Sequence, residues 1–153
     1  LRTAVKVGGL EMREILFKAK RLDNGEWVKG SLISTEDNSG FILQSKTKAF
    51  IPKGANTFCS TECYEIDPTT LCQYTGLTDK NGKRIWENDI IEDDVNCYRV
   101  YWSKKYSNFS CECVKTDEPI FKGRKWDLWS IIQEEEIYVK GNIFDNQELL
   151  EVE

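Results

Sequence analysis

Short stretches in which apolar and polar residues alternate, separated by turn-forming residues, recur along the whole chain. The stretches at 14–20 and 26–34 flank the tripeptide Asp-Asn-Gly at 23–25. These three residue types tolerate positive φ angles, so we predict a β-hairpin over this region. Enrichment in aromatic and β-branched residues predicts a second pair of strands at 40–44 and 48–52.

The second half of the chain continues the same pattern. Five further stretches are predicted as strands, at 71–75, 84–92, 96–102, 108–114 and 136–144. The dipeptides Asn-Gly at 81–82 and Ser-Asn at 107–108 are placed as turns between strands. Periodicity does not decide between a strand and a short helix for 125–132. Asp145 and Asn146 resemble helix N-cap residues and predict a short helical ending at 147–150. Many short strands with frequent turns predict a small barrel or sandwich.

The strand pattern weakens between 53 and 70, where Gly, Asn, Ser, Thr and Pro accumulate. We therefore predict an N-terminal β-hairpin region at 12–66 and a second region at 67–153. Residues 1–11 precede Met12, the only methionine of the chain. They are expected to derive from an expression vector or to form a genuine N-terminal extension, and the sequence leaves both open.

The charge of the chain is unevenly distributed. The 153 residues carry a formal net charge of −5, and the segment 134–153 alone carries −6, so the preceding residues sum to +1. A near-neutral body excludes a strongly basic nucleic-acid binder but leaves room for a local basic patch. No apolar run approaches the roughly 20 residues that a membrane-spanning helix needs.

Six cysteines and no histidine restrict the metal chemistry of the chain. A four-thiolate metal site from Cys59, Cys63, Cys111 and Cys113 is one interpretation, although neither pair has the usual zinc spacing. The other interpretation is that the thiols are reduced and mostly buried, with Cys111 and Cys113 on the same face of a strand. We expect the second, and therefore no bound metal.

Three segments resemble the YopX family of phage and prophage proteins. Residues 73–91 read QYTGLTDKNGKRIWENDII, close to the family pattern Q-Y-T-G-L-x-D-K-N-G-K-x-I-Y-E-G-D-I-V. Residues 139–150 resemble the closing V-I-G-N-I-Y-E-N-P-E-L-L of the family, and residues 13–28 resemble its usual start. Asn88 replaces a usual glycine, and asparagine is well suited to keep the same left-handed turn. Gln147 stands where the family often has proline.

The resemblance implies a mainly β protein with an SH3-like small barrel after the hairpin region and a short C-terminal helix. It also implies a phage or prophage accessory protein in the cytoplasm of a host bacterium, with self-association as a further implication. These remain expectations at the level of sequence.

The sequence contains little catalytic chemistry. Histidine, the commonest proton-transfer residue near neutral pH, is absent, and no phosphate-loop, dinucleotide or nucleophile-elbow fingerprint is present. Asp79 and Asp89 could form a pair of catalytic carboxylates, but a turn residue and a strand-entry residue explain them better. We predict that the chain is not an enzyme and binds no cofactor.

A protein-binding module that modulates a host factor is the leading functional hypothesis. Exposed carboxylates at Glu134, Glu135 and Glu136 would contact a host or phage protein. Nucleic-acid binding is the alternative, because basic and aromatic residues interleave at 101–109 and 122–129. The predicted binding residues are Tyr74, Asp79, Lys104, Lys105, Arg124, Lys125, Trp126, Glu134, Glu135 and Glu136. In the competing structural interpretation, Trp102, Trp126 and Trp129 are core residues and the lysines occupy solvated turns.

Overall fold

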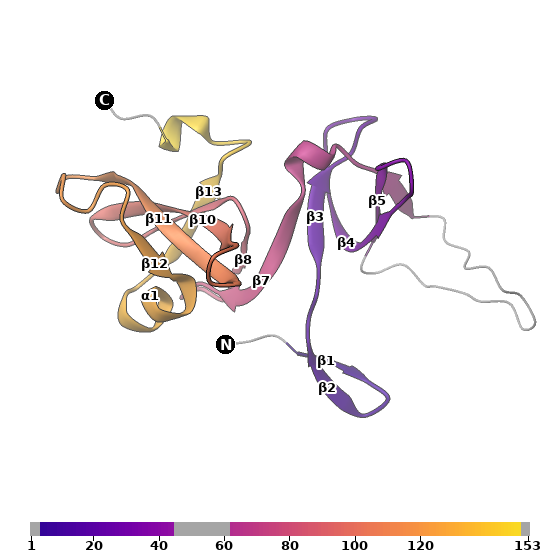
Figure 1. Ribbon diagram of the computed structural model, residues 1–153, viewed down its shortest axis with the longest axis horizontal. Helices are drawn as coiled ribbons and strands as arrows, with labels where there is room; N and C mark the ends of the chain where they lie inside the picture. Colours follow the sequence, from indigo (N-terminus) through magenta and orange to yellow (C-terminus); the bar gives the residue numbers. More distant parts are fainter. Residues whose placement is uncertain (1–3, 45–61, 151–153) are drawn as a thin grey trace, which may run out of the picture. The chain divides into compact units, whose positions relative to one another are not determined.

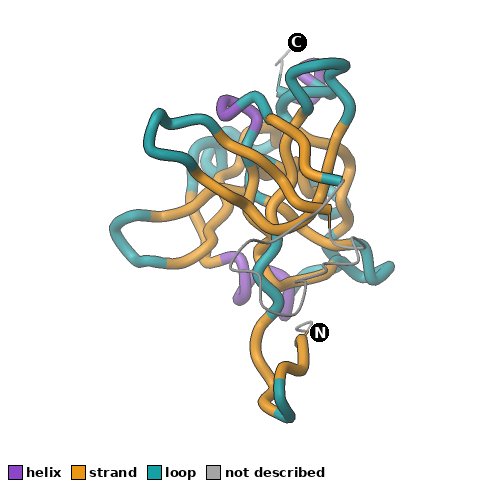
Figure 2. Tube along the Cα trace, turned by 90° about the vertical axis from the view of Figure 1, so that its right-hand side faces the viewer, coloured by secondary structure: helices purple, strands orange, loops and turns teal. Residues whose placement is uncertain are grey.

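The structure is a computed structural model that describes residues 4–44 and 62–150 (Figure 1). Strands dominate these residues, and helix is confined to short segments (Figure 2). The prediction of a mainly β protein is therefore confirmed. The chain divides into two compact units. We call Ile15–Gln73 the hairpin unit, and Leu1–Glu14 together with Tyr74–Glu153 the terminal unit.

The hairpin unit is an antiparallel sheet with the strand order β6-β5-β4-β3-β7. Its strands are β3 (Phe17–Lys20), β4 (Trp27–Ser34), β5 (Gly40–Gln44), β6 (Cys63–Glu65) and the first residues of β7 (Cys72–Thr78). A short 3₁₀ helix, η1 (Pro68–Thr70), precedes β7. The centre of the core consists of Ala19, Val28, Ile42 and Ile66, each at most 2% exposed.

The predicted hairpin at the start of this unit is confirmed. Strands β3 and β4 are antiparallel, with Ala19 opposite Val28. Gly25 has a φ of 73°, which glycine adopts without steric cost, and the Arg21 amide donates to the Glu26 carbonyl at 2.9 Å to close the turn. The predicted strand at 40–44 is β5, which pairs with β4 and β6. The predicted strand at 48–52 lies outside the described residues.

The terminal unit contains a five-stranded antiparallel sheet with the order β12-β11-β10-β9-β13. The strands of this sheet are β9 (Asp89–Glu92), β10 (Asn96–Ser103), β11 (Asn108–Thr116), β12 (Lys125–Asp127) and β13 (Tyr138–Asn142). The end of β7 pairs with β8 (Arg84–Trp86). A separate two-stranded sheet joins β1 (Ala4–Val7) and β2 (Leu10–Arg13). Helix α1 (Leu128–Glu134) follows β12, and the 3₁₀ helix η2 (Gln147–Leu149) ends the described chain.

Alternation along the strands of the terminal unit builds its core. In β10, Tyr98 and Val100 are buried while Arg99 between them is exposed. Leu128 and Ile131, on one face of α1, join the same core. Burial of these apolar side chains stabilises the unit by about 25 cal/mol for each Å² removed from water.

Two tight turns of the terminal unit follow the sequence expectations. Asn88 has a φ of 64°, so it adopts the left-handed conformation predicted for this position. Gly82 has a φ of 78° in the turn between β7 and β8, and the Gly82 amide donates to the Asp79 carbonyl at 3.0 Å. Both turns therefore depend on residue types that tolerate positive φ.

The segment 125–132 forms a strand and then a helix. Residues of β12 pair with β11, and Asp127 then caps α1, its carboxylate accepting from the Ser130 amide at 2.9 Å. The predicted helical ending at 147–150 is present as η2, but its capping differs from the expectation. Asn146 makes no side-chain capping bond; its Oδ1 instead accepts from the Asn142 amide at 3.2 Å.

The two units divide between Gln73 and Tyr74, whereas the sequence analysis placed a boundary between 66 and 67. The division falls inside β7, whose first residues pair with β3 and whose later residues pair with β8. A continuous strand has no linker composition, so the sequence offers no signal at this point. The SH3-like arrangement of the second region stays a prediction.

Candidate functional site

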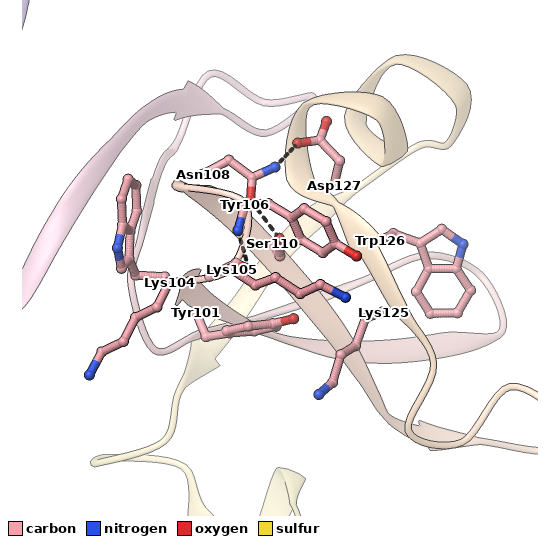
Figure 3. Close-up of a pocket in the computed structure, with 11 residues that line it drawn as sticks. Tyr101, Lys104, Lys105, Tyr106, Asn108, Ser110, Lys125, Trp126 and Asp127 are labelled. Atoms are coloured by element: carbon pink, nitrogen blue, oxygen red, sulfur yellow. Dashed lines mark hydrogen bonds between the residues drawn. The ribbon is translucent and has the colours of Figure 1, made fainter.

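A groove of about 730 Å³ opens in the terminal unit beside the turn between β10 and β11 (Figure 3). We call it the lysine–aromatic groove. It is lined by the aromatic residues Tyr101, Trp102, Tyr106 and Trp126, the lysines Lys104, Lys105 and Lys125, and the polar residues Ser103, Asn108, Ser110 and Asp127. Strand register brings these residues together, because Tyr101 lies opposite Ser110 and Ser110 opposite Asp127 across β10, β11 and β12.

Lysine ammonium groups lie close to the aromatic rings of the groove. The Nζ of Lys105 is 5.0 Å from the ring centroid of Tyr106, and the Nζ of Lys125 is 5.8 Å from that of Tyr101 (Figure 3). Such cation–π contacts hold positive charge beside an apolar ring face. Tyr106 is 67% exposed, so its ring is accessible to a ligand.

Hydrogen bonds fix the polar side of the groove. Asn108 Nδ2 donates to Asp127 Oδ1 at 2.6 Å, and Ser110 Oγ donates to Asn108 Oδ1 at 3.0 Å (Figure 3). The other oxygen of Asp127 accepts from both the amide and the hydroxyl of Ser130. Both oxygens of the single carboxylate that lines the groove are thus engaged. Three lysines against one carboxylate give the lining a net charge of +2.

The structure brings together four of the residues that the sequence analysis selected. Lys104, Lys105, Lys125 and Trp126 all line the groove. Arg124 does not line it; its guanidinium carbon lies 5.4 Å from the ring centroid of Phe121. Position along the sequence therefore identified the basic segment but not which of its residues face the groove.

Tyr74 and Asp79 occupy buried positions. Tyr74 is 2% exposed, its ring 5.3 Å from that of Trp86. Asp79 is 6% exposed and accepts hydrogen bonds from the amides of Asn81 and Lys83. Burial makes both poor candidates for direct contact with a macromolecule, and it favours the structural interpretation of the turn.

The three predicted glutamates lie at the end of α1 and just beyond it, and all are exposed. Glu135 and Glu136 line a second hollow, of about 380 Å³, together with Asp93 and Asp94. This acidic hollow does not share a lining residue with the lysine–aromatic groove.

The core interpretation of the three tryptophans holds only for Trp126. Trp126 is partly buried and packs edge-to-face against the core residue Tyr98 at 5.5 Å. Trp102 and Trp129 are 42% and 43% exposed, because they lie at the end of β10 and on the outer face of α1. Tyr101 and Tyr106 belong to the interleaved segment but were not selected as site residues. The predicted turn at Ser107 is the sequence signal that could have identified them, because a hairpin there pairs the end of β10 with the start of β11.

Three of the five described cysteines, Cys72, Cys111 and Cys113, are buried. Cys111 and Cys113 are both buried on one face of β11, as predicted. Cys63 is exposed in β6, and Cys59 lies outside the described residues. No group of three or more Cys, Asp or Glu residues in the described part of the chain could hold a metal ion. Burial raises the pKa of Cys113, which opposes thiolate formation despite nearby Lys115.

Alkaline pH should destabilise the protein through Cys111. Burial, with a smaller contribution from the Asp127 charge, raises the pKa of this thiol from 9.0 to about 12. Between these values the unfolded chain releases the proton and the folded chain retains it, so stability falls as pH rises. We expect wild type to lose about 2 kcal/mol more than Cys111→Ala between about pH 8.5 and about pH 10.5, measured by urea unfolding. Parallel pH dependences of the two proteins would contradict this.

No helix within 4–44 or 62–150 is long and apolar enough to cross a membrane.

No curated protein matches the chain significantly. Among solved structures, the crystal structure of protein EF1440 from Enterococcus faecalis is similar, with a TM-score of 0.57 and 21% sequence identity. The likeness covers 90% of this chain and 99% of that chain, and at this identity it shows the fold alone. The profile described as YopX protein matches residues 16–151, and the chain therefore belongs to the YopX family.

Proposed function

We propose that this chain is a non-enzymatic binding protein of phage or prophage origin, and that its lysine–aromatic groove binds single-stranded nucleic acid in the host cytoplasm. The observation that carries the proposal is the meeting of exposed aromatic rings and lysines in one groove. From the sequence alone, a protein partner is the leading hypothesis. The geometry of the groove favours nucleic acid, because its lining combines the two features that an unpaired strand requires.

The lining supplies a separate contact for each part of a nucleotide. Exposed aromatic rings such as Tyr106 can stack on a base, which contributes about 1 to 3 kcal/mol for each base. Lys104, Lys105 and Lys125 can pair with phosphates, and no ion pair with a carboxylate is found for them among the described residues. Bases in a duplex already stack on one another, so rings in a groove favour an unpaired strand.

Replacing Lys104, Lys105 and Lys125 together with alanine should abolish most of the binding. Each lysine that contacts a phosphate contributes about 0.7 to the slope of log affinity against log salt concentration for a single strand. We therefore expect the triple variant to reduce the slope by about 2 and the affinity by at least about 30-fold at low salt. Fluorescence anisotropy with labelled homopolymeric DNA and RNA at several salt concentrations measures both quantities.

A charge-matched control separates the groove from general electrostatics. Lys80, Lys83 and Lys122 are exposed lysines of the same unit that do not line the groove. Replacing these three with alanine removes the same charge, and we expect a loss of affinity below about 3-fold. Equal losses in the two triple variants, or no binding by wild type, would overturn the proposal.

A protein partner at the acidic residues is the second candidate function. Its support is the hollow in which Glu135 and Glu136, just after α1, meet Asp93 and Asp94 from the turn after β9. Four carboxylates in one place form a negative surface that suits a basic partner. A saturable complex with a host protein that is lost in Glu135→Gln/Glu136→Gln, and retained in the lysine variant, would support it.

A further inference from the structure

Another hollow, distinct from the acidic one, adjoins the lysine–aromatic groove across Trp102. It has a volume of about 290 Å³, and Trp102, Asn108 and Asp127 line both this hollow and the groove. Trp102 packs edge-to-face against Phe109, with ring centroids 5.0 Å apart and an interplanar angle of 71°. This contact fixes the indole while leaving the side chain 42% exposed. Trp102 is thus a fixed, accessible aromatic ring between two recesses.

This hollow shares part of the chemistry of the lysine–aromatic groove, although Arg13 and Asp127 together leave its lining without net charge. Trp129 and Arg13 line it, so it also combines an aromatic ring with a positive charge. We call it the Trp129 hollow. Trp129 is 43% exposed and lies in the first turn of α1, which Asp127 caps through the Ser130 amide. Arg13 is followed directly by Glu14, whose two carboxylate oxygens each accept from Arg84 Nη2 at 2.8 Å.

We propose that an unpaired strand runs from the lysine–aromatic groove across Trp102 into the Trp129 hollow, so that the ligand is a stretch of several nucleotides. This inference rests on the proposed function and extends it. Trp102 stacks a base at the crossing point, Trp129 stacks a later base, and Arg13 pairs with a phosphate between or beyond them.

The shared polar residues favour such a path. Asp127 lines both hollows, yet both of its oxygens already accept hydrogen bonds, from Asn108 on one side and Ser130 on the other. Its charge is therefore partly offset along the path, which reduces the repulsion of phosphates. Asn108 donates one amide hydrogen to Asp127 and accepts from Ser110, so its remaining hydrogen and lone pair can bond a base edge.

The length dependence of binding tests this path. A strand of about 4 nucleotides can fill the lysine–aromatic groove alone, whereas one of about 12 can reach both hollows. We expect wild type to bind oligothymidylate of the longer length at least about 10-fold more tightly than the shorter. Trp129→Ala and Arg13→Ala should each weaken binding of the long strand by about 5-fold or more and leave the short strand unchanged.

Two further variants sharpen the result. Trp129→Phe retains an aromatic face and should recover most of the affinity of the long strand. Trp102→Ala, at the crossing point, should weaken both strands. Two results would overturn the two-hollow path. One is an equal affinity of wild type for the short and the long strand, after correction for the number of binding positions on each. The other is an equal effect of Trp129→Ala on the binding of the two strands. In that case the short strand would still bind, so the proposed function would stand. If neither the short nor the long strand binds, the proposed function and the two-hollow path are both overturned.

Discussion

Replacing Asp79 with alanine is expected to lower the free energy of unfolding of the terminal unit by about 3 to 5 kcal/mol. Asp79 is 6% exposed, and its carboxylate accepts three hydrogen bonds from backbone amides. Oδ1 accepts from Asn81 at 2.9 Å and Lys83 at 2.8 Å, inside the turn after β7. Oδ2 accepts from Val139 at 3.0 Å, which ties that turn to β13.

The large effect follows from what alanine leaves behind. Each of the three part-buried amides loses its acceptor, and a donor left unpaired out of water costs about 1 to 3 kcal/mol. The Lys80 amide also donates to the Ile137 carbonyl at 3.1 Å, beside the bond from Val139. Loss of the carboxylate therefore weakens the whole attachment of β13 to the turn. Total stabilities of domains are about 5 to 15 kcal/mol, so the variant should be near the limit of folding.

Asp37 provides a matched control. Its carboxylate accepts from the Ser39 amide at 3.1 Å and from the Thr35 hydroxyl, but the turn is local and exposed. Asp37→Ala should cost less than about 1 kcal/mol. Urea unfolding of the full chain, followed by tryptophan fluorescence and circular dichroism, measures both variants. A loss for Asp79→Ala no larger than that for Asp37→Ala would contradict the role assigned to the carboxylate.

The local part of the Asp79 arrangement was predictable from sequence. An Asp shortly before an Asn-Gly turn predicts hydrogen bonds from nearby backbone amides to its carboxylate. The bonds from the amides of Asn81 and Lys83 are present. The bond to Val139 was not predictable, because it joins residues 60 positions apart. The residue types next to a turn predict its hydrogen bonds, whereas the pairing of β9 with β13 depends on the packing of the whole sheet.

The lysine–aromatic groove also has one part that the sequence predicts and one part that it does not. Its lysines and rings at 101–109 are neighbours in sequence, and a hairpin around Ser107 brings them to one end of β10 and β11. The contribution of β12 depends on Ser110 lying opposite Asp127 and Cys111 opposite Trp126. The segment between β11 and β12 has no length rule that fixes this register, and a slip of one residue would turn Trp126 to the other face. Sequence therefore selected Lys125 and Trp126 without specifying that they line the groove.

Burial of the tryptophans was the least predictable feature. Period-2 alternation puts Trp102 on the same face as Val100, which is fully buried. Trp102 lies two residues nearer the end of β10, where core residues no longer cover it. Alternation specifies a face of the sheet, but distance from the sheet centre decides exposure, and that distance requires the three-dimensional structure.

Replacing Gly30 with alanine is expected to destabilise the hairpin unit by about 3 kcal/mol or more. A Cβ on Gly30 would lie 1.7 Å from the carbonyl oxygen of Leu43 and 2.6 Å from its carbonyl carbon. These are backbone atoms of β5, so no side-chain rotation relieves the overlap. Separation of β4 from β5 is the only relief, and it disrupts the pairing of Ser31 with Leu43 and of Leu32 with Ile42.

Gly40 is the matched control for this substitution, because it lies in β5 opposite Ser34 of β4. A Cβ there would meet Cγ1 and Cδ1 of Ile66 at 3.2 Å, a far milder approach, and to side-chain rather than backbone atoms. Gly40→Ala should therefore change stability by less than about 1 kcal/mol. Two-dimensional NMR of the full chain distinguishes the variants: in Gly30→Ala the amide signals of β3, β4 and β5 should broaden or collapse, while those of β9, β10 and β11 persist. Retained, dispersed signals from β4 and β5 would show that the strands accommodate a methyl group, and the close approach at Gly30 would then not determine their pairing.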